Sequence, residues 1–201
     1  GTEVNQELSD ETAVSLGLSA EALASVVEKT MTLSIQIANL VQTADRAIAS
    51  TTDGGVQTVQ ERALMVASSV AKQVEASAIE VEGAGGVISL SDPAIVETVL
   101  TETLVDTASE IATTIEAKQA SGFLDEASLD AETSAAIIEL KSQSEVIVQT
   151  GLSEDYASQI AAIAQTSAAV NEQSAGIIAS AGVGVLADTS AGTSLASLVA
   201  D

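Results

Sequence analysis

Aliphatic residues recur at alternating spacings of three and four along most of the chain. This is the pattern of helices that pack against one another along a single apolar stripe. The only proline is Pro93, so few positions interrupt these segments. The sequence predicts an all-α fold, an antiparallel helical bundle of about five helices with short Gly/Ser-capped turns. The five stripes run from Leu23 to Ile48, Val56 to Gln73, Val96 to Ile115, Ile137 to Ile147 and Tyr156 to Ile177.

Helix ends are marked by capping residues. Asp92 precedes Pro93, which pairs an N-cap acceptor with the residue favoured at the first helical position. Gly17–Ser19 and Gly151–Ser153 both read Gly-Leu-Ser, which suits a left-handed glycine that ends one helix and a serine that caps the next. Gly122 is expected to end the third helix. These signals predict tight turns between helices.

We expect one helical-bundle domain over residues 1–201. Residues 8–82 would form a first helical hairpin, 83–91 a hinge or a small irregular strand, 92–182 three further helices, and 183–201 a Gly-rich tail with room for a short helix. No fixed period of 20–50 residues is found, which argues against a solenoid. Because the chain starts at Gly1 instead of Met, we expect a processed product or an excised fragment.

Charge limits the partners. The 201 residues include 29 Asp and Glu against 6 Lys and Arg, for a formal net charge of −23. Such a chain cannot neutralise a row of phosphates, so nucleic acid is excluded as a partner, and an anionic membrane surface is equally unsuitable. Self-repulsion at this charge destabilises a compact state unless cations screen it. We therefore expect adaptation to salt or divalent cations.

Missing residue types exclude most catalytic chemistry. The chain has no His and no Cys, which removes the imidazole base, the thiol nucleophile, the disulfide and nearly every zinc site. Phe123 and Tyr156 are the only aromatic residues, too few to build a stacking pocket for sugars or bases. We predict that the protein is not an enzyme and assign no catalytic, cofactor-binding or metal-binding residues.

Three carboxylates are spaced so that they could in principle bind a metal ion together. Glu102, Asp106 and Glu110 are four residues apart and would line one helical face. Calcium prefers oxygen ligands, but a regular helix rarely directs six oxygens at one ion, and no EF-hand loop pattern is present. We interpret the three as a solvated acidic face. Calcium could bind elsewhere, yet the sequence identifies no ligand set.

Other candidate motifs have simpler explanations. Gly182–Ala187 matches the dinucleotide pattern G-x-G-x-x-A, but it lacks the preceding strand that the motif requires, so we interpret it as a flexible helix end. Glu80 with Glu82, and Asp130 with Glu132, could form acid–base pairs only in a cleft that separates their pKa values. We interpret both pairs as solvated surface.

Two asparagines interrupt the apolar stripes. Asn39 and Asn171 fall among stripe residues, and we predict that they are buried polar residues that set the register of neighbouring helices. The most apolar tract, Ile160–Ala187, is broken by polar residues such as Glu172. It is therefore not expected to span a membrane.

Three segments carry a resemblance to known proteins. They are residues 14–23, 33–41 and 90–100, which read VSLGLSAEAL, LSIQIANLV and LSDPAIVETVL. They resemble the Ala/Thr-rich helical segments of large type-I-secreted bacterial calcium-binding (RTX/cadherin-like) surface adhesins. The resemblance covers most of residues 9–180. It implies an extracellular or cell-surface location in a bacterium, a calcium-rich setting and a non-catalytic role. The chain lacks the RTX nonapeptide and any cadherin-type Asp cluster, so it implies no calcium ligands.

The sequence leaves three functions open. The first is a non-enzymatic structural or adhesive module of a secreted bacterial surface protein, which contacts neighbouring domains of a larger protein or copies of itself. Self-assembly could then form a cation-dependent layer or filament. The second is an amphipathic helical protein that coats an apolar surface such as a storage granule, as phasin-like proteins do. The third is the helical region of a signalling receptor or a flagellin-like subunit.

Overall fold

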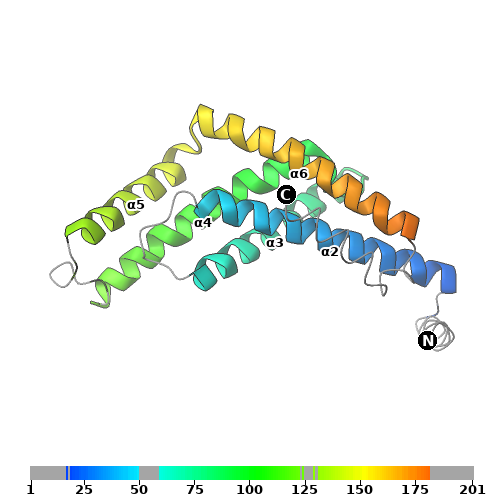
Figure 1. Cartoon of the computed structure of the whole chain (residues 1–201), viewed down its shortest axis with the longest axis horizontal. Coiled ribbons are helices and arrows are strands. Elements are labelled where there is room, and N and C mark those ends of the chain that lie inside the picture. The colour runs from blue at the N-terminus through cyan, green and yellow to red at the C-terminus, as the bar shows by residue number, and fades with distance from the viewer. Residues whose placement is uncertain are drawn as a thin grey trace. The chain divides into compact units, whose positions relative to one another are not determined.

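The computed structural model describes residues 17, 19–49, 59–122, 124, 129 and 131–181. These residues form five helices and no strand, so the prediction of an all-α fold with about five helices is confirmed (Figure 1). The helices are α2 (Ala20–Ala49), α3 (Val59–Gly83), α4 (Pro93–Ala120), α5 (Ala131–Thr150) and α6 (Glu154–Ala181).

The helix starts follow the predicted capping chemistry. The Asp92 carboxylate accepts a hydrogen bond from the backbone N–H of Ala94 at 2.9 Å, and Pro93 is the first residue of α4. Ser19 does the same for α2, because its hydroxyl accepts from the N–H of Ala22 at 3.1 Å. A side-chain acceptor at this position satisfies an N–H that has no partner within the helix.

The turn between α5 and α6 is as short as the sequence predicts. Gly151 has φ +77°, the left-handed conformation that favours glycine, and its N–H donates to the carbonyl of Ile147 at 2.8 Å. Two residues later the Ser153 hydroxyl accepts from the N–H of Tyr156 at 3.4 Å. Three residues thus end one helix and begin the next.

Residues 84–92 form a loop between α3 and α4 and not the irregular strand that the sequence also allowed. Gly85 has φ +79°, and the N–H of Gly86 donates to the carbonyl of Val81 at 2.9 Å. A Cβ at Gly86 would lie 2.9 Å from Cγ1 of Val81, so the chain can fold back over the end of α3 only with glycine there.

The described helices belong to two compact units. One contains α2 up to Asn39 and α6 from Ala169, and the other contains Leu40–Ala168. We call them the hairpin unit and the core unit. Whether the chain behaves as one domain stays a prediction.

Helix α4 is the centre of the core unit, where it packs against α3 and α5. Every residue of the third predicted stripe is buried, from Val96 through Leu100 to Ile115. Their partners on α5 include Ile137 and Leu140, which are also buried. The aliphatic stripe of α4 is therefore buried along its whole length.

The stripe predicted for α3 is only partly correct. Val66 and Val70 are fully buried as expected. Val59, placed in the same stripe, lies in the first turn of α3 and is 69% exposed, and Val56 lies outside the described residues. Regular spacing identifies a helical face but does not show how far along the helix a neighbour covers it.

The hairpin unit has an unusual interior. Its buried residues include Gln36 (6% exposed), Asn171 (0%) and Ser174 (1%), with Ile178 as the buried large aliphatic residue. The large aliphatic residues of its α2 segment, such as Leu33 and Ile37, are only half-buried. The two helix segments thus meet largely through polar side chains.

Candidate functional site

Asp106 is the focus of a polar cluster between α3 and α4. Its Oδ2 accepts hydrogen bonds from Lys72 Nζ at 2.6 Å, Gln73 Nε2 at 2.9 Å and Ser69 Oγ at 3.3 Å. Partial burial raises the pKa of the Asp106 carboxyl, but these hydrogen bonds and the charge of Lys72 outweigh it, so the pKa lies below its ordinary value. The cluster fixes α3 against α4 and leaves Asp106 ionised.

The three carboxylates predicted to form one solvated face of α4 differ in their exposure to solvent. Glu102 and Glu110 are exposed, as expected. For Asp106 the prediction was wrong, because this side chain is 31% exposed and accepts hydrogen bonds from residues of α3. The sequence of α4 alone gives no indication of these partners. Among the described residues, no group of three His, Cys, Asp or Glu side chains could hold a metal ion.

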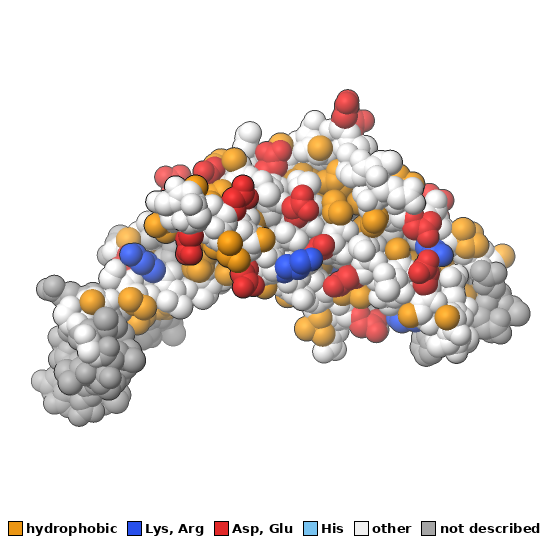
Figure 2. Space-filling view, turned by 180° about the vertical axis from the view of Figure 1, so that it is seen from behind, with side chains coloured by type: hydrophobic (Ala, Val, Ile, Leu, Met, Phe, Trp, Pro, Cys, Tyr) orange, Lys and Arg blue, Asp and Glu red, His pale blue; other side chains and the backbone are white. Residues whose placement is uncertain are grey.

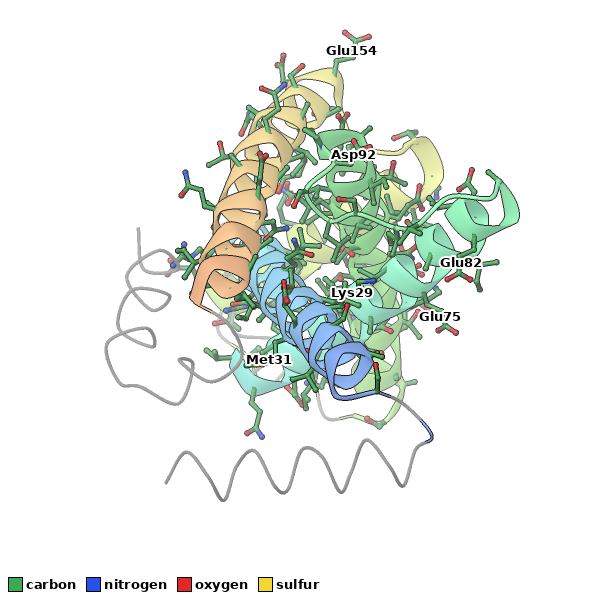
Figure 3. The ribbon with its side chains drawn as sticks, turned by 90° about the vertical axis from the view of Figure 1, so that its right-hand side faces the viewer. Lys29, Met31, Glu75, Glu82, Asp92 and Glu154 are labelled. Carbon is green, nitrogen blue, oxygen red and sulfur yellow. The ribbon has the colours of Figure 1, made fainter. Side chains whose placement is uncertain are left out.

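The predicted surface pairs are exposed where they are described. Glu80 and Glu82 lie on the last turns of α3 with both side chains exposed, and Figure 3 shows Glu82 pointing away from the helices. Glu132 is exposed in the first turn of α5. Asp130 and the Gly182–Ala187 motif lie outside the described residues.

The two asparagines of the stripes contact each other, which the sequence did not predict; the predicted burial is confirmed for Asn171, whereas Asn39 is half-buried. Asn39 Nδ2 donates to Asn171 Oδ1 at 2.9 Å, and Gln36 Nε2 donates to the backbone carbonyl of Asn171 at 3.3 Å. Asn171 is fully buried, so any other alignment of the two helices would leave its amide without these partners. The pair therefore sets the register of α2 against α6.

The core unit contains an open groove of about 700 Å³. Leu104, Thr107 and Ile111 of α4 form part of its lining, together with Leu140 and Ile147 of α5. The groove also reaches the end of α2, the α5–α6 turn and the first residues of α6. Its volume lies in the range of natural small-ligand pockets, about 300–1,000 Å³.

The chemistry of this groove suits apolar contact. Its ionisable lining residues are Glu139, Glu154 and Tyr156. Both carboxylates are exposed, and Figure 3 shows Glu154 pointing outward from the start of α6. Burial raises the pKa of the Tyr156 hydroxyl, which donates to the backbone carbonyl of Ala47 at 3.4 Å. The groove can hold an apolar side chain or small molecule beside an acidic edge.

Sequence reasoning missed this groove and two hydroxyls next to it. Thr103 and Thr107 lie one turn apart on α4, both 0% exposed, and neither Oγ1 has a hydrogen-bond partner among the residues that the structure describes. A buried hydroxyl without a partner destabilises the folded state. No local pattern distinguishes these threonines from Thr98 and Thr113 of the same helix, whose hydroxyls donate to backbone carbonyls one turn earlier.

No helix within the described ranges combines the length and apolar character needed to cross a membrane. Comparison of the chain with protein-family models, with curated proteins and with solved structures finds no match.

Proposed function

We propose that this chain is a non-enzymatic structural or adhesive module of a secreted bacterial surface protein, one that works through contacts with neighbouring domains or with copies of itself. The observation that carries the proposal is the groove of the core unit. It offers an aliphatic lining that includes Leu104 and Ile147, and its carboxylates, Glu139 and Glu154, are solvated. That arrangement favours binding an apolar group over acid–base chemistry, which needs carboxyl groups with separated pKa values.

The use of buried polar groups supports the same role. Asn39, Gln36 and Asn171 join α2 to α6, and Asp106 joins α4 to α3. Each of these polar groups holds one helix in position against another. A structural or adhesive module of this kind carries mechanical load or presents a binding surface. Its specificity for a partner depends on which helix faces remain exposed to solvent.

The exterior is consistent with a salt-rich setting. On the face shown in Figure 2, Asp and Glu side chains are spread between hydrophobic and polar atoms and outnumber the Lys and Arg side chains. Among the described residues, ion pairs such as Arg62–Asp45 (2.8 Å) and Lys141–Glu116 (3.2 Å) involve a minority of the acidic side chains. Cations from the medium would supply the remaining screening.

A coat on an apolar granule is the alternative. It would require large hydrophobic residues along one continuous face of a helix. On α3 the exposed large hydrophobics are Val59, Leu64 and Ile79. Val59 lies on a different side of the helix from Leu64, and Leu64 and Ile79 are separated by about four helical turns, so they form no continuous face. This scatter favours the structural module.

The test is the location of the protein in cells that produce it. Intact cells would be treated with an externally added protease and then probed with an antibody raised against the purified chain, with a cytoplasmic protein as the control. We expect the chain to be digested while the cytoplasmic control survives.

Two outcomes would contradict the proposal. In one, the chain survives on intact cells and is digested only after lysis. In the other, it floats with polymer or lipid granules on a density gradient, which would establish the granule coat in its place.

A further inference from the structure

The groove of the core unit is elongated and follows α5. Its lining takes residues of α5 from Glu139 to Thr150, a length of about 17 Å of helix. Most of these residues lie in two neighbouring rows at helical spacing. Leu140, Ser144 and Ile147 are buried or half-buried and form a wall, whereas the second row is exposed and forms a rim. The rim residues are Glu139, Gln143, Val146 and Thr150.

The charges of the groove have one sign. Glu139 and Glu154 belong to its lining, and no Lys or Arg does. Within the described residues, no ion pair involves either carboxylate. Gln143 Nε2 donates to Glu139 Oε1 at 2.7 Å, which holds this carboxylate on the rim without neutralising it. The bases that pair with carboxylates outside the groove are Arg62, Lys72, Lys118 and Lys141.

The two carboxylates lie toward opposite ends of the apolar lining. Glu139 begins the stretch of α5 that lines the groove, and Glu154 follows the far end of α5, beyond the α5–α6 turn. Leu140 and Ile147 lie between them in the sequence. An occupant that complements this arrangement has an apolar middle and a positive charge toward each end.

The walls of the groove select a helical occupant. The backbone groups inside α4 and α5 are bonded within their own helices, so an extended segment would find no backbone partners there. A helix satisfies its own N–H and C=O groups and can lay an apolar face into a groove between two helices. About 17 Å corresponds to three helical turns, enough to direct several side chains at the wall.

We propose that this groove binds a basic amphipathic helix, with its aliphatic side chains against Leu140 and Ile147 and its Lys or Arg side chains beside Glu139 and Glu154. This rests on the proposed structural role and names the chemistry of the partner. The helix belongs to a different protein or domain, because this chain has 6 basic residues among 201. An acidic helix or a fatty acid would bring like charge to both ends of the groove.

The first test compares two synthetic peptides of about 14 residues, slightly longer than the groove. One has Leu on one helical face and Lys on the other, and the second has Glu in place of every Lys. Each peptide carries a fluorescent label, and its anisotropy is measured as the full chain is added. We expect the Lys peptide to bind with a Kd of about 1–100 µM, and the Glu peptide to bind at least about tenfold more weakly.

The second test separates the groove from the general acidity of the chain. The double variant Glu139→Gln, Glu154→Gln removes two charges from the groove, and Glu75→Gln, Glu82→Gln removes two from exposed positions of α3, which does not line it (Figure 3). We expect the first to raise the Kd of the Lys peptide about threefold or more and the second to change it less than about twofold.

A third comparison tests the apolar contact. Val146 of the rim is 54% exposed, and Val148, which does not line the groove, is 46% exposed on the same helix. Truncation to Ala at either position removes the same two methyl groups from the surface. We expect V146A to raise the Kd of the Lys peptide about threefold, and V148A to leave it unchanged.

Three results would overturn the inference: no binding of the Lys peptide up to about 1 mM, equal binding of the Lys and Glu peptides, or an equal effect of the two double Gln variants. Equal effects of V146A and V148A would also overturn it. None of these results alters where the protein is located in cells, so each would leave the proposed function standing.

Discussion

Replacing the two buried threonines of α4 by valine is expected to stabilise the protein. Thr103 and Thr107 are fully buried, and within the described part of the chain their hydroxyls have no hydrogen-bond partner. Burying such a group costs about 1–3 kcal/mol, whereas valine has nearly the same shape and a similar helix propensity. Each of Thr103→Val and Thr107→Val should therefore raise the free energy of unfolding by about 1–2 kcal/mol.

The assay is urea-induced unfolding followed by far-ultraviolet circular dichroism, with Tm as a second readout. A chain of this size should gain about 2–4 °C per kcal/mol. Thr98→Val and Thr113→Val are matched controls on the same helix, because both side chains are exposed and their hydroxyls already donate to backbone carbonyls. They should change stability by less than about 0.5 kcal/mol. Destabilisation by T103V or T107V would refute the view that these hydroxyls lack partners.

Three further predictions concern charge and the groove. The lowered pKa of the Asp106 carboxyl contributes stability that is present near neutral pH and is lost as pH falls below about 4. Asp106→Ala should therefore lower the free energy of unfolding by about 1 kcal/mol at pH 7 and weaken the loss of stability at acid pH, as measured by urea unfolding at several pH values. Tm should rise with NaCl or millimolar calcium, because cations screen the net charge of −23; an unchanged Tm would contradict this. Val146→Glu, at an exposed lining position, should reduce binding of the neutral apolar dye Nile red to the groove more than Val148→Glu, which lies outside it; equal loss would count against the groove.

Features set by neighbouring residues could be predicted from the sequence. The caps at Ser19 and Asp92 and the left-handed Gly151 depend on contacts within one turn of helix, so residue order alone identifies them. The stripe of α4 was also predictable, because its apolar face meets helices along its whole length. The burial of Asn171 within an apolar stripe was predicted, but its pairing with Asn39 was not, because the two residues are 132 positions apart.

Features that depend on distant segments could not be predicted. Asp106 looks solvated on its own helix, and its partners lie 33 to 37 residues earlier in the chain. The groove is assembled from four helices and a turn, none of which carries a local signal for it. The stripe of α2 is regular throughout, and only tertiary structure shows that Leu40 is covered while Val26 is not.

Hydrogen exchange of backbone amides with and without saturating Nile red tests the central claim, that the groove of the core unit binds an apolar group. We predict that amides of residues 146–156, at the α5–α6 end of the groove, exchange more slowly when the dye is bound, while those of α3, which does not line the groove, exchange at an unchanged rate. If exchange in residues 146–156 is the same with and without the dye, or if α3 slows equally, the account is contradicted.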